Sequence, residues 1–337
     1  MMGPERLPPG TGEDRLIARY FRPLARHPGA FGLLDDAATL TPPTGHDVVL
    51  TTDAIVGGVH FFPDDPPDTI AKKALRGNLS DLAAKGAKPA GFLLSLALPQ
   101  TVGEDWLEGF ACGLGADADA YGCPLLGGDS VRTGGPVTIS IAAFGTLPGG
   151  TMVRRSGAHA GDRLVVTGTI GDAALGLLVR RDGEAAKRWR LDQSERDRLL
   201  DRYLLPRPRN ALAEALRQHA SAAMDVSDGL AGDLAKLCAA SGVGGDVEIA
   251  RVPLSRAAQR AIAADRSLIE TALTGGDDYE IVAAVPAAAL DRLAAQARAL
   301  GVALTEIGVI RSDSGVAQFL NPAGHPLIFK QPSFSHF

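Results

Sequence analysis

The sequence predicts a two-domain protein of the α/β (α+β) class. Apolar runs rich in β-branched residues alternate along the chain with stretches whose apolar residues recur at helical spacing. The 337 residues are enough for about two domains of roughly 100–200 residues each. Glycine supplies 40 residues and aromatics only 5%, a balance that favours tight strand-to-helix turns over a β-sandwich.

In the first half of the chain, the pattern of strands and helices predicts one mixed domain over residues 1–149. After a loose terminal segment at 1–13, apolar residues recur at helical spacing over 14–26. Further along, the pattern predicts a strand at 48–52, a helix at 69–85, a strand at 92–98, a helix at 104–121 and a strand at 137–147.

In the second half of the chain, the pattern predicts an α/β domain over residues 150–337. The candidate junction between the two domains is at 147–157. That junction combines a proline, a pair of adjacent glycines and a pair of adjacent arginines. Beyond it we expect a strand and helix over 162–178, polar helices over 184–217 with a break at 206–210, renewed alternation from 222 and a strand near 302–310.

Charge and composition exclude several classes of protein. A net charge of −5 without a Lys/Arg-rich block argues against nucleic acid as a partner. The longest apolar run, at 91–99, is too short to span a membrane, and the first residues lack the layout of a signal peptide. Cys112, Cys123 and Cys238 match no zinc spacing, so we expect a cytoplasmic protein with reduced thiols.

Short acidic motifs give the clearest chemical signal. In most of them an aspartate follows an apolar run and neighbours glycine, serine or threonine, as at the end of a strand. Carboxylates at strand ends suit hard divalent cations, and N–H groups beside glycine suit phosphate. The pattern predicts metal-assisted phosphoryl chemistry. The motifs are LLDDAATL (33–40), LTTDAIVGGVHF (50–61), NLSDLAAKGAKP (78–89), LLGGDS (125–130), MDVSDGL (224–230) and TGGDDYE (274–280).

Several of these acids also have an ordinary structural explanation. Asp53 could cap a turn, and the adjacent Asp35 and Asp36 could lie in a solvated loop. Asp81 could face water from an amphipathic helix. GGDS alone is as typical of a turn as of a phosphate site.

Other residues are more informative. Ser227 or Asp228 could cap a helix, but capping does not explain the third acid, Asp225. His60 is a lone histidine, which favours a structural role over catalysis. No Walker A pattern and no GxGxxG after a strand occurs, so nucleotide binding would depend on carboxylates and magnesium.

Taken in order, the motifs resemble those of the thiamine-monophosphate kinase family. The resemblance includes RRSGAHAGD and VTGTIGDAALG as well, and it runs from about residue 14 to 336. It implies the two-domain fold of aminoimidazole ribonucleotide synthetase, a relative in the same superfamily. The implied assembly is a homodimer in which N-terminal mixed sheets form a barrel, each with an α/β domain behind it.

The resemblance also implies an enzyme, an ATP-dependent thiamine-phosphate kinase. It would transfer a phosphoryl group in line from ATP to thiamine monophosphate, giving ADP and thiamine diphosphate, with several Mg²⁺ ions. Asp129, Arg155 and Asp225 would be catalytic. The implied metal ligands are Asp36, Thr51, Thr52, Asp53, Asp81, Asp129, Asp225 and Asp228. The implied ATP contacts are Tyr121, Gly128, Asp129, Arg155 and Ser227, and the implied thiamine phosphate contacts are His60, Asp277 and Phe334.

Three positions depart from the family pattern. Leu34 stands where a glycine usually precedes the acidic pair, Asp277 replaces a glutamate, and Phe334 replaces a tyrosine or tryptophan. None of the three removes a charged ligand, so we expect an active enzyme. The alternatives are an ATP-dependent ligase like aminoimidazole ribonucleotide synthetase, or a nucleotide-binding relative that has lost catalysis.

Overall fold

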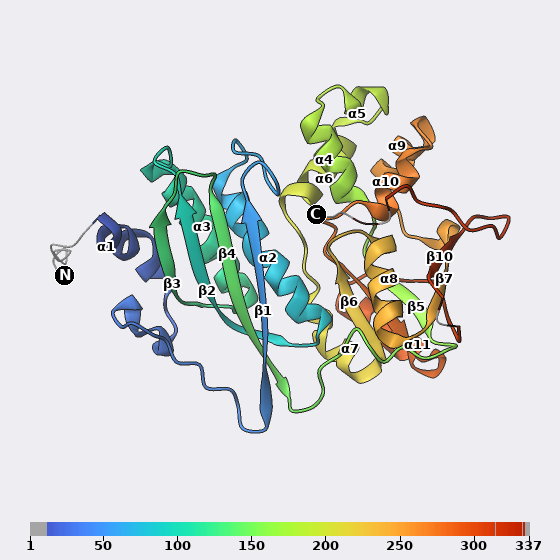
Figure 1. The fold of residues 1–337 in the computed structure, drawn as a ribbon, viewed down its shortest axis with the longest axis horizontal. Helices are drawn as coiled ribbons and strands as arrows, with labels where there is room; N and C mark the ends of the chain where they lie inside the picture. The colour runs from blue at the N-terminus through green and yellow to red at the C-terminus, as the bar shows by residue number, and fades with distance from the viewer. Residues whose placement is uncertain (1–11, 314, 332, 334–337) are drawn as a thin grey trace. The chain divides into compact units, whose positions relative to one another are not determined.

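The structure is a computed structural model that describes residues 12–313, 315–331 and 333. Its chain divides into two units (Figure 1). Unit 1 comprises Met1–Asn78 and Pro89–Thr146, and unit 2 comprises Leu79–Lys88 and Leu147–Phe337. Among the described helices, none is both long enough and apolar enough to cross a membrane.

Unit 1 is built on a four-stranded sheet with the strand order β1-β4-β2-β3. Figure 1 shows α2 and α3 together on one face of this sheet. Alternate residues of β4 are buried, as expected for a sheet with one covered face. The bounds are β1 His46–Val56, α2 Pro67–Ala84, β2 Lys88–Leu98, α3 Glu104–Tyr121, β3 Leu125–Arg132 and β4 Thr138–Pro148.

The opposite face of the sheet in unit 1 has exposed apolar side chains. Leu50, Leu93 and Val131 are 68%, 36% and 49% exposed. Leu93 and Val131 share a face because Leu93 pairs with Gly127 and Ala97 pairs with Val131 in the parallel register of β2 and β3. We call this surface the open face of unit 1.

The helix predicted over 14–26 is wrong as a single α-helix. The segment has α1 at Gly12–Leu16, a π-helical turn at Ile17–Phe21 and a 3₁₀ turn at Arg22–Leu24. Pro23 lies in the last turn, and its ring cannot continue an α-helix. The other predicted elements of this half are confirmed, with ends shifted by a few residues.

Unit 2 contains a six-stranded sheet with the strand order β10-β7-β9-β5-β8-β6. Its strands pair antiparallel except for β10 and β7, which are parallel. The bounds are β5 Arg163–Thr167, β6 Ala222–Val226, β7 Gly244–Glu248, β8 Glu280–Val285, β9 Leu304–Arg311 and β10 Ala317–Leu320.

Helices cover both faces of this second sheet. Val166 packs in one apolar cluster with Leu234 of α8, whereas the adjacent Val165 packs in another with Leu216 of α7 and Leu293 of α11. Neighbouring side chains of a strand point to opposite faces, so the sheet lies between two helical layers. The bounds are α7 Ala213–His219, α8 Leu230–Ser241, α10 Leu268–Thr274 and α11 Leu290–Ala299.

A further group of helices packs around its own apolar cluster in unit 2. Gly176 of α4 lies so close to α6 that a Cβ there would meet the Leu199 carbonyl oxygen at 2.0 Å. At the start of α6, Asp192 and Glu195 form a capping box, which sets where this helix begins. The bounds are α4 Asp172–Arg181, α5 Ala185–Arg188, α6 Gln193–Leu204 and α9 Arg256–Ala264.

Candidate functional site

A cavity of about 750 Å³ lies on the open face of unit 1. Apolar side chains such as Leu93, Leu125 and Phe144 line it. Its polar lining includes Asp36 and Asp129, which come from distant parts of the sequence. The cavity therefore brings together two predicted metal ligands, with Gly128 beside them.

The position of Asp129 is set by the pairing of β3 with β2. Ser95 pairs with Asp129 and Leu94 with Gly128 in a parallel register. Asp129 thus lies inside a strand, although the sequence places it at a strand end or turn. Its Oδ1 accepts a hydrogen bond from the Ser130 N–H at 2.8 Å, and its side chain is exposed.

Asp36 lies in the connection that precedes β1. The Asp35 side chain accepts the N–H of Asp36 at 2.8 Å, which turns the chain at the acidic pair. Leu34, the departure from the family's glycine, has a φ of −108°. Any residue adopts that backbone conformation, so the leucine introduces no backbone strain at this point.

Thr51, Thr52 and Asp53 lie on β1 and do not line the cavity. Because side chains alternate along a strand, Thr51 and Asp53 share one face and Thr52 has the other. The Thr52 hydroxyl donates to the Ile141 carbonyl of β4 at 3.0 Å. The structure thus separates these three predicted ligands between two faces.

His60 and Tyr121 are both held by specific contacts in unit 1. The Nδ1 atom of His60 accepts the Val56 N–H at 2.9 Å, so the proton of the neutral ring lies on Nε2. Tyr121 is the last residue of α3, and the Arg76 guanidinium lies 5.8 Å from its ring centroid. Arg76 also makes a two-point ion pair with the buried Asp117.

In unit 2, Lys85 is a cation that the sequence analysis missed. Its Nζ donates to the Ala223 carbonyl of β6 at 2.7 Å. Burial lowers the pKa of Lys85 to about 8, while Asp225 and Asp81 raise this pKa and Arg155 lowers it. Three predicted site residues therefore act electrostatically on this one amine. The position of Lys85, one helical turn after Asp81 in the same motif, was the available signal.

Asp228 forms an ion pair with Lys236 in this structure. The Lys236 Nζ lies 2.6 Å from Asp228 Oδ2 and 2.9 Å from Asp233 Oδ1. The Asp228 N–H donates to Asp233 at 2.9 Å, so Asp233 orders the turn before α8. Burial raises the pKa of Asp233, and the bond from Lys236 opposes that shift.

The TGGDDYE segment lies against the end of β6. The Asp277 N–H donates to the Ser227 carbonyl, and the Tyr279 N–H donates to the Val226 carbonyl, each at 2.8 Å. This contact brings the predicted Asp277 beside the predicted Ser227. Phe334 lies outside the described residues.

Within residues 12–313, 315–331 and 333, no three His, Cys, Asp or Glu side chains converge closely enough to hold a metal ion. Asp36 and Asp129 on the cavity wall nevertheless offer only oxygen donors. Oxygen donors suit Mg²⁺, which proteins commonly bind through one or two carboxylates together with phosphates of a substrate. The residues present fit that mode and do not form a complete protein cage.

Comparison with known families covers most of the chain. Residues 34–147 match the family model described as AIR synthase related protein, N-terminal domain. Residues 159–320 match the corresponding C-terminal domain model.

Individual relatives match over most of their length. Thiamine-monophosphate kinase of Caulobacter vibrioides is 43% identical over 307 residues, which cover 90% of this chain and 85% of that protein. A crystal structure of thiamine-monophosphate kinase from Stenotrophomonas maltophilia K279a has a TM-score of 0.81 at 38% identity, covering 93% of this chain and 96% of that one. A structure of AaThiL complexed with AMPPCP and TMP has a TM-score of 0.75 at 28% identity, covering 92% and 97%.

Proposed function

Since the chain belongs to the thiamine-monophosphate kinase family, we propose that it transfers a phosphoryl group from ATP to thiamine monophosphate. The products are ADP and thiamine diphosphate, in the biosynthesis of the latter. The observation that carries the proposal is the cavity that unites Asp36, Gly128 and Asp129, in a chain so similar to these kinases. The AaThiL complex with AMPPCP and TMP supports the same pair of substrates.

In unit 1, Asp36 and Asp129 are the proposed holders of Mg²⁺ with the phosphates of ATP. When bound there, Mg²⁺ would neutralise phosphate charge. Gly128 lies at the cavity wall beside Asp129, and its backbone is a proposed contact to ATP. Tyr121 is the proposed edge of the ATP pocket, and Thr51, Thr52 and Asp53 complete the proposed ligand set on β1.

In unit 2, the residues around Lys85 have a related role. Asp81, Asp225 and Asp228 are proposed metal ligands, and Arg155 and Ser227 are proposed contacts to ATP. For Asp228, metal binding requires that its ion pair with Lys236 open or be shared. Lys85 provides a positive charge near Asp225 and Asp81 that lessens the repulsion between their carboxylates.

The proposed mechanism is direct in-line transfer. The acceptor is already a phosphate anion, so the reaction needs no strong general base. The work of the residues is to bring two anions into line and to offset their repulsion. Arg155 would contribute positive charge at this step, and Asp129 and Asp225 would hold the Mg²⁺ ions that supply charge neutralisation to the phosphates.

The acceptor side is assigned to His60, Asp277 and Phe334. With Nδ1 accepting from Val56, the neutral His60 ring has Nε2 as its donor atom. A hydrogen bond from Nε2 to a phosphate oxygen is the interaction that we assign to it. Asp277 carries a carboxylate suited to the cationic ring of thiamine.

The protein is proposed to act as a homodimer in the cytoplasm. The open face of unit 1 exposes Leu50, Leu93 and Val131, side chains that a second copy could cover. Pairing of two such sheets would form the barrel that the family resemblance implies.

The test is ADP release from Mg-ATP with thiamine monophosphate, with the product identified by chromatography. Thiamine and formylglycinamidine ribonucleotide serve as alternative acceptors. Thiamine diphosphate formed only from the monophosphate would support the proposal. Turnover with the ribonucleotide would favour the ligase alternative, and nucleotide binding without turnover would favour the inactive relative.

A further inference from the structure

The segment between α10 and β8 has an unusual backbone. Asp277 and Tyr279 have φ angles of 74° and 48°, in the left-handed region that non-glycine residues seldom adopt. Each such residue costs on the order of 1 kcal/mol, and it persists where neighbouring structure fixes it. The residue between them, Asp278, is fully buried.

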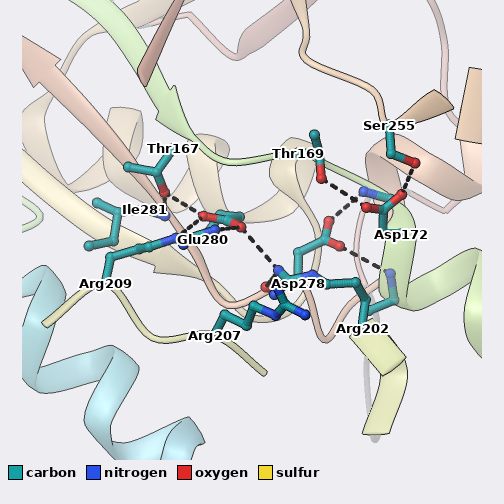
Figure 2. Close-up of polar contacts among 12 residues, drawn as sticks. Thr167, Thr169, Asp172, Arg202, Arg207, Arg209, Ser255, Asp278, Glu280 and Ile281 are labelled. Atoms are coloured by element: carbon teal, nitrogen blue, oxygen red, sulfur yellow. Dashed lines mark hydrogen bonds and ion pairs between the residues drawn. The ribbon is translucent and has the colours of Figure 1, made fainter. Parts of the chain in front are cut away.

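Glu280, the first residue of β8, is enclosed by cations. Figure 2 shows its carboxylate between Arg209, Arg202 and Thr167. Arg209 donates through Nε to Oε2 at 2.6 Å and through Nη2 to Oε1. Arg202 donates to Oε1 at 3.0 Å, and the Thr167 hydroxyl donates to Oε2 at 2.7 Å.

Asp278 anchors the same segment to a helix. Its Oδ2 accepts the Gly171 N–H at 2.6 Å and its Oδ1 the Ala173 N–H at 3.3 Å, at the N-terminus of α4. Arg202, which bonds Glu280, also donates to the backbone carbonyl of Asp278 at 2.9 Å. The Arg202 guanidinium therefore bonds both Asp278 and Glu280, the two buried residues of the segment that follows Asp277 (Figure 2).

The other side of the segment is fixed by the end of β6. The Asp277 and Tyr279 N–H groups bond the carbonyls of Ser227 and Val226. Gly276 lies so close to this strand end that a Cβ would meet the Ser227 carbonyl oxygen at 2.5 Å. The buried carboxylates and this backbone contact hold Asp277 in its left-handed conformation from both sides.

We propose that Glu280, held by Arg202 and Arg209, is a positioning residue that fixes Asp277 for binding of the thiamine phosphate. This inference rests on the proposed function. A buried ion cluster is often no more stabilising than apolar residues of similar size, so stability alone does not account for it. The geometry instead links the Glu280 ion cluster to Asp277, the strained residue that lies three positions before Glu280 in the chain.

Glu280→Gln is the test variant, because it removes the charge and one acceptor but keeps the shape. Glu195→Gln is its matched control in the same unit. Glu195 is also a buried carboxylate, with a side chain 6% exposed, and it also has two arginine partners, Arg256 and Arg260. Both variants should lower Tm, because Glu280→Gln leaves the buried Arg202 without its charged partner and Glu195→Gln weakens the ion pairs that the buried Glu195 makes with the more exposed Arg256 and Arg260.

Two readouts separate positioning from a general loss of stability. In Glu280→Gln we expect the KM for thiamine monophosphate to rise roughly tenfold, as for a lost charged hydrogen bond, with the KM for ATP little changed. We also expect faster amide hydrogen exchange in the peptide that contains Asp277 and Tyr279. Glu195→Gln should show neither effect, and Arg209→Lys should give an intermediate KM because it keeps the charge.

Equal KM changes in the two glutamine variants, or unchanged exchange in Glu280→Gln, would overturn the positioning role. Wild-type protein that fails to phosphorylate thiamine monophosphate would overturn the proposed function instead. In that case the exchange comparison would still decide whether Glu280 fixes the segment.

Discussion

Gly128 of β3 lies against the carbonyl oxygen of Leu94 in β2, and a Cβ at residue 128 would meet that oxygen at 1.9 Å. The Leu94 oxygen is a backbone atom that cannot move aside as a flexible side chain could, so Gly128→Ala must shift one of the two strands. At the adjacent Gly127, a Cβ would meet only the Leu93 side chain, at 3.2 Å.

We therefore expect Gly128→Ala to cost about 3 kcal/mol or more of unfolding free energy, beyond the usual range for overpacking. It should also lower turnover, because Asp129 follows directly. Gly127→Ala should cost about 1 kcal/mol or less, since a leucine side chain can move. Denaturant unfolding measures both, and a cost for Gly128→Ala as small as that for Gly127→Ala would show that β2 and β3 tolerate a side chain at either position.

A second prediction concerns metal and nucleotide. If Asp36 and Asp129 hold Mg²⁺ with ATP, Mg-ATP should raise Tm by mass action, and EDTA should abolish the rise. Asp129→Asn should lose most of this rise and most of the turnover while keeping the Tm of the metal-free protein.

Asp105→Asn is the control for that substitution, because it makes the same charge change at an exposed residue in the first turn of α3. It should keep the wild-type response to Mg-ATP. A full thermal shift in Asp129→Asn would contradict the assignment of this carboxylate as a metal ligand.

Sequence patterns predicted the fold class and most elements, because helical spacing and apolar runs are local signals. The helix at 14–26 failed where Pro23 interrupts a favourable apolar pattern. The strand β3 was not predicted, because GGDS resembles a turn unless its partner β2 is known.

The candidate site residues were predicted from sequence motifs, which contain no information on side-chain contacts. Neither Lys85 nor the Glu280 cluster was anticipated, because Lys85 meets β6 and Glu280 meets Arg202 and Arg209 only after folding. Motif order predicted which acids carry chemistry, and those assignments stay predictions. It contained no information on which acids are buried and paired, as Asp278 and Glu280 are.

The three cysteines should differ sharply in reactivity. Cys112 is exposed, whereas burial raises the pKa of Cys123 to about 12 and that of Cys238 to about 11. Since the thiolate is the nucleophile, iodoacetamide at about pH 8 should modify Cys112 first. Mass spectrometry of the native protein measures this, and Cys112→Ser should remove the fast phase. Fast modification of Cys123 would contradict its burial.

The last prediction concerns Lys85 and pH. Burial lowers its pKa in the folded protein to about 8 from an ordinary value of 10.5, so folding releases a proton between these two values. The unfolded chain binds more protons in that window, and the unfolding free energy contributed by Lys85 therefore rises as pH rises. Below about pH 8 both states are protonated, and the full cost of burying the ammonium is present.

Lys85→Met is the matched variant, since methionine keeps an unbranched chain without the charge. We expect the stability of the wild type relative to Lys85→Met to increase between about pH 8 and pH 10.5 and to be constant just below that window. Chemical unfolding in EDTA measures this difference, and other titrating groups cancel because both proteins share them. A difference independent of pH would mean that the Lys85 ammonium is hydrated or fully offset by Asp225 and Asp81, and that its bond to Ala223 does not take it out of water.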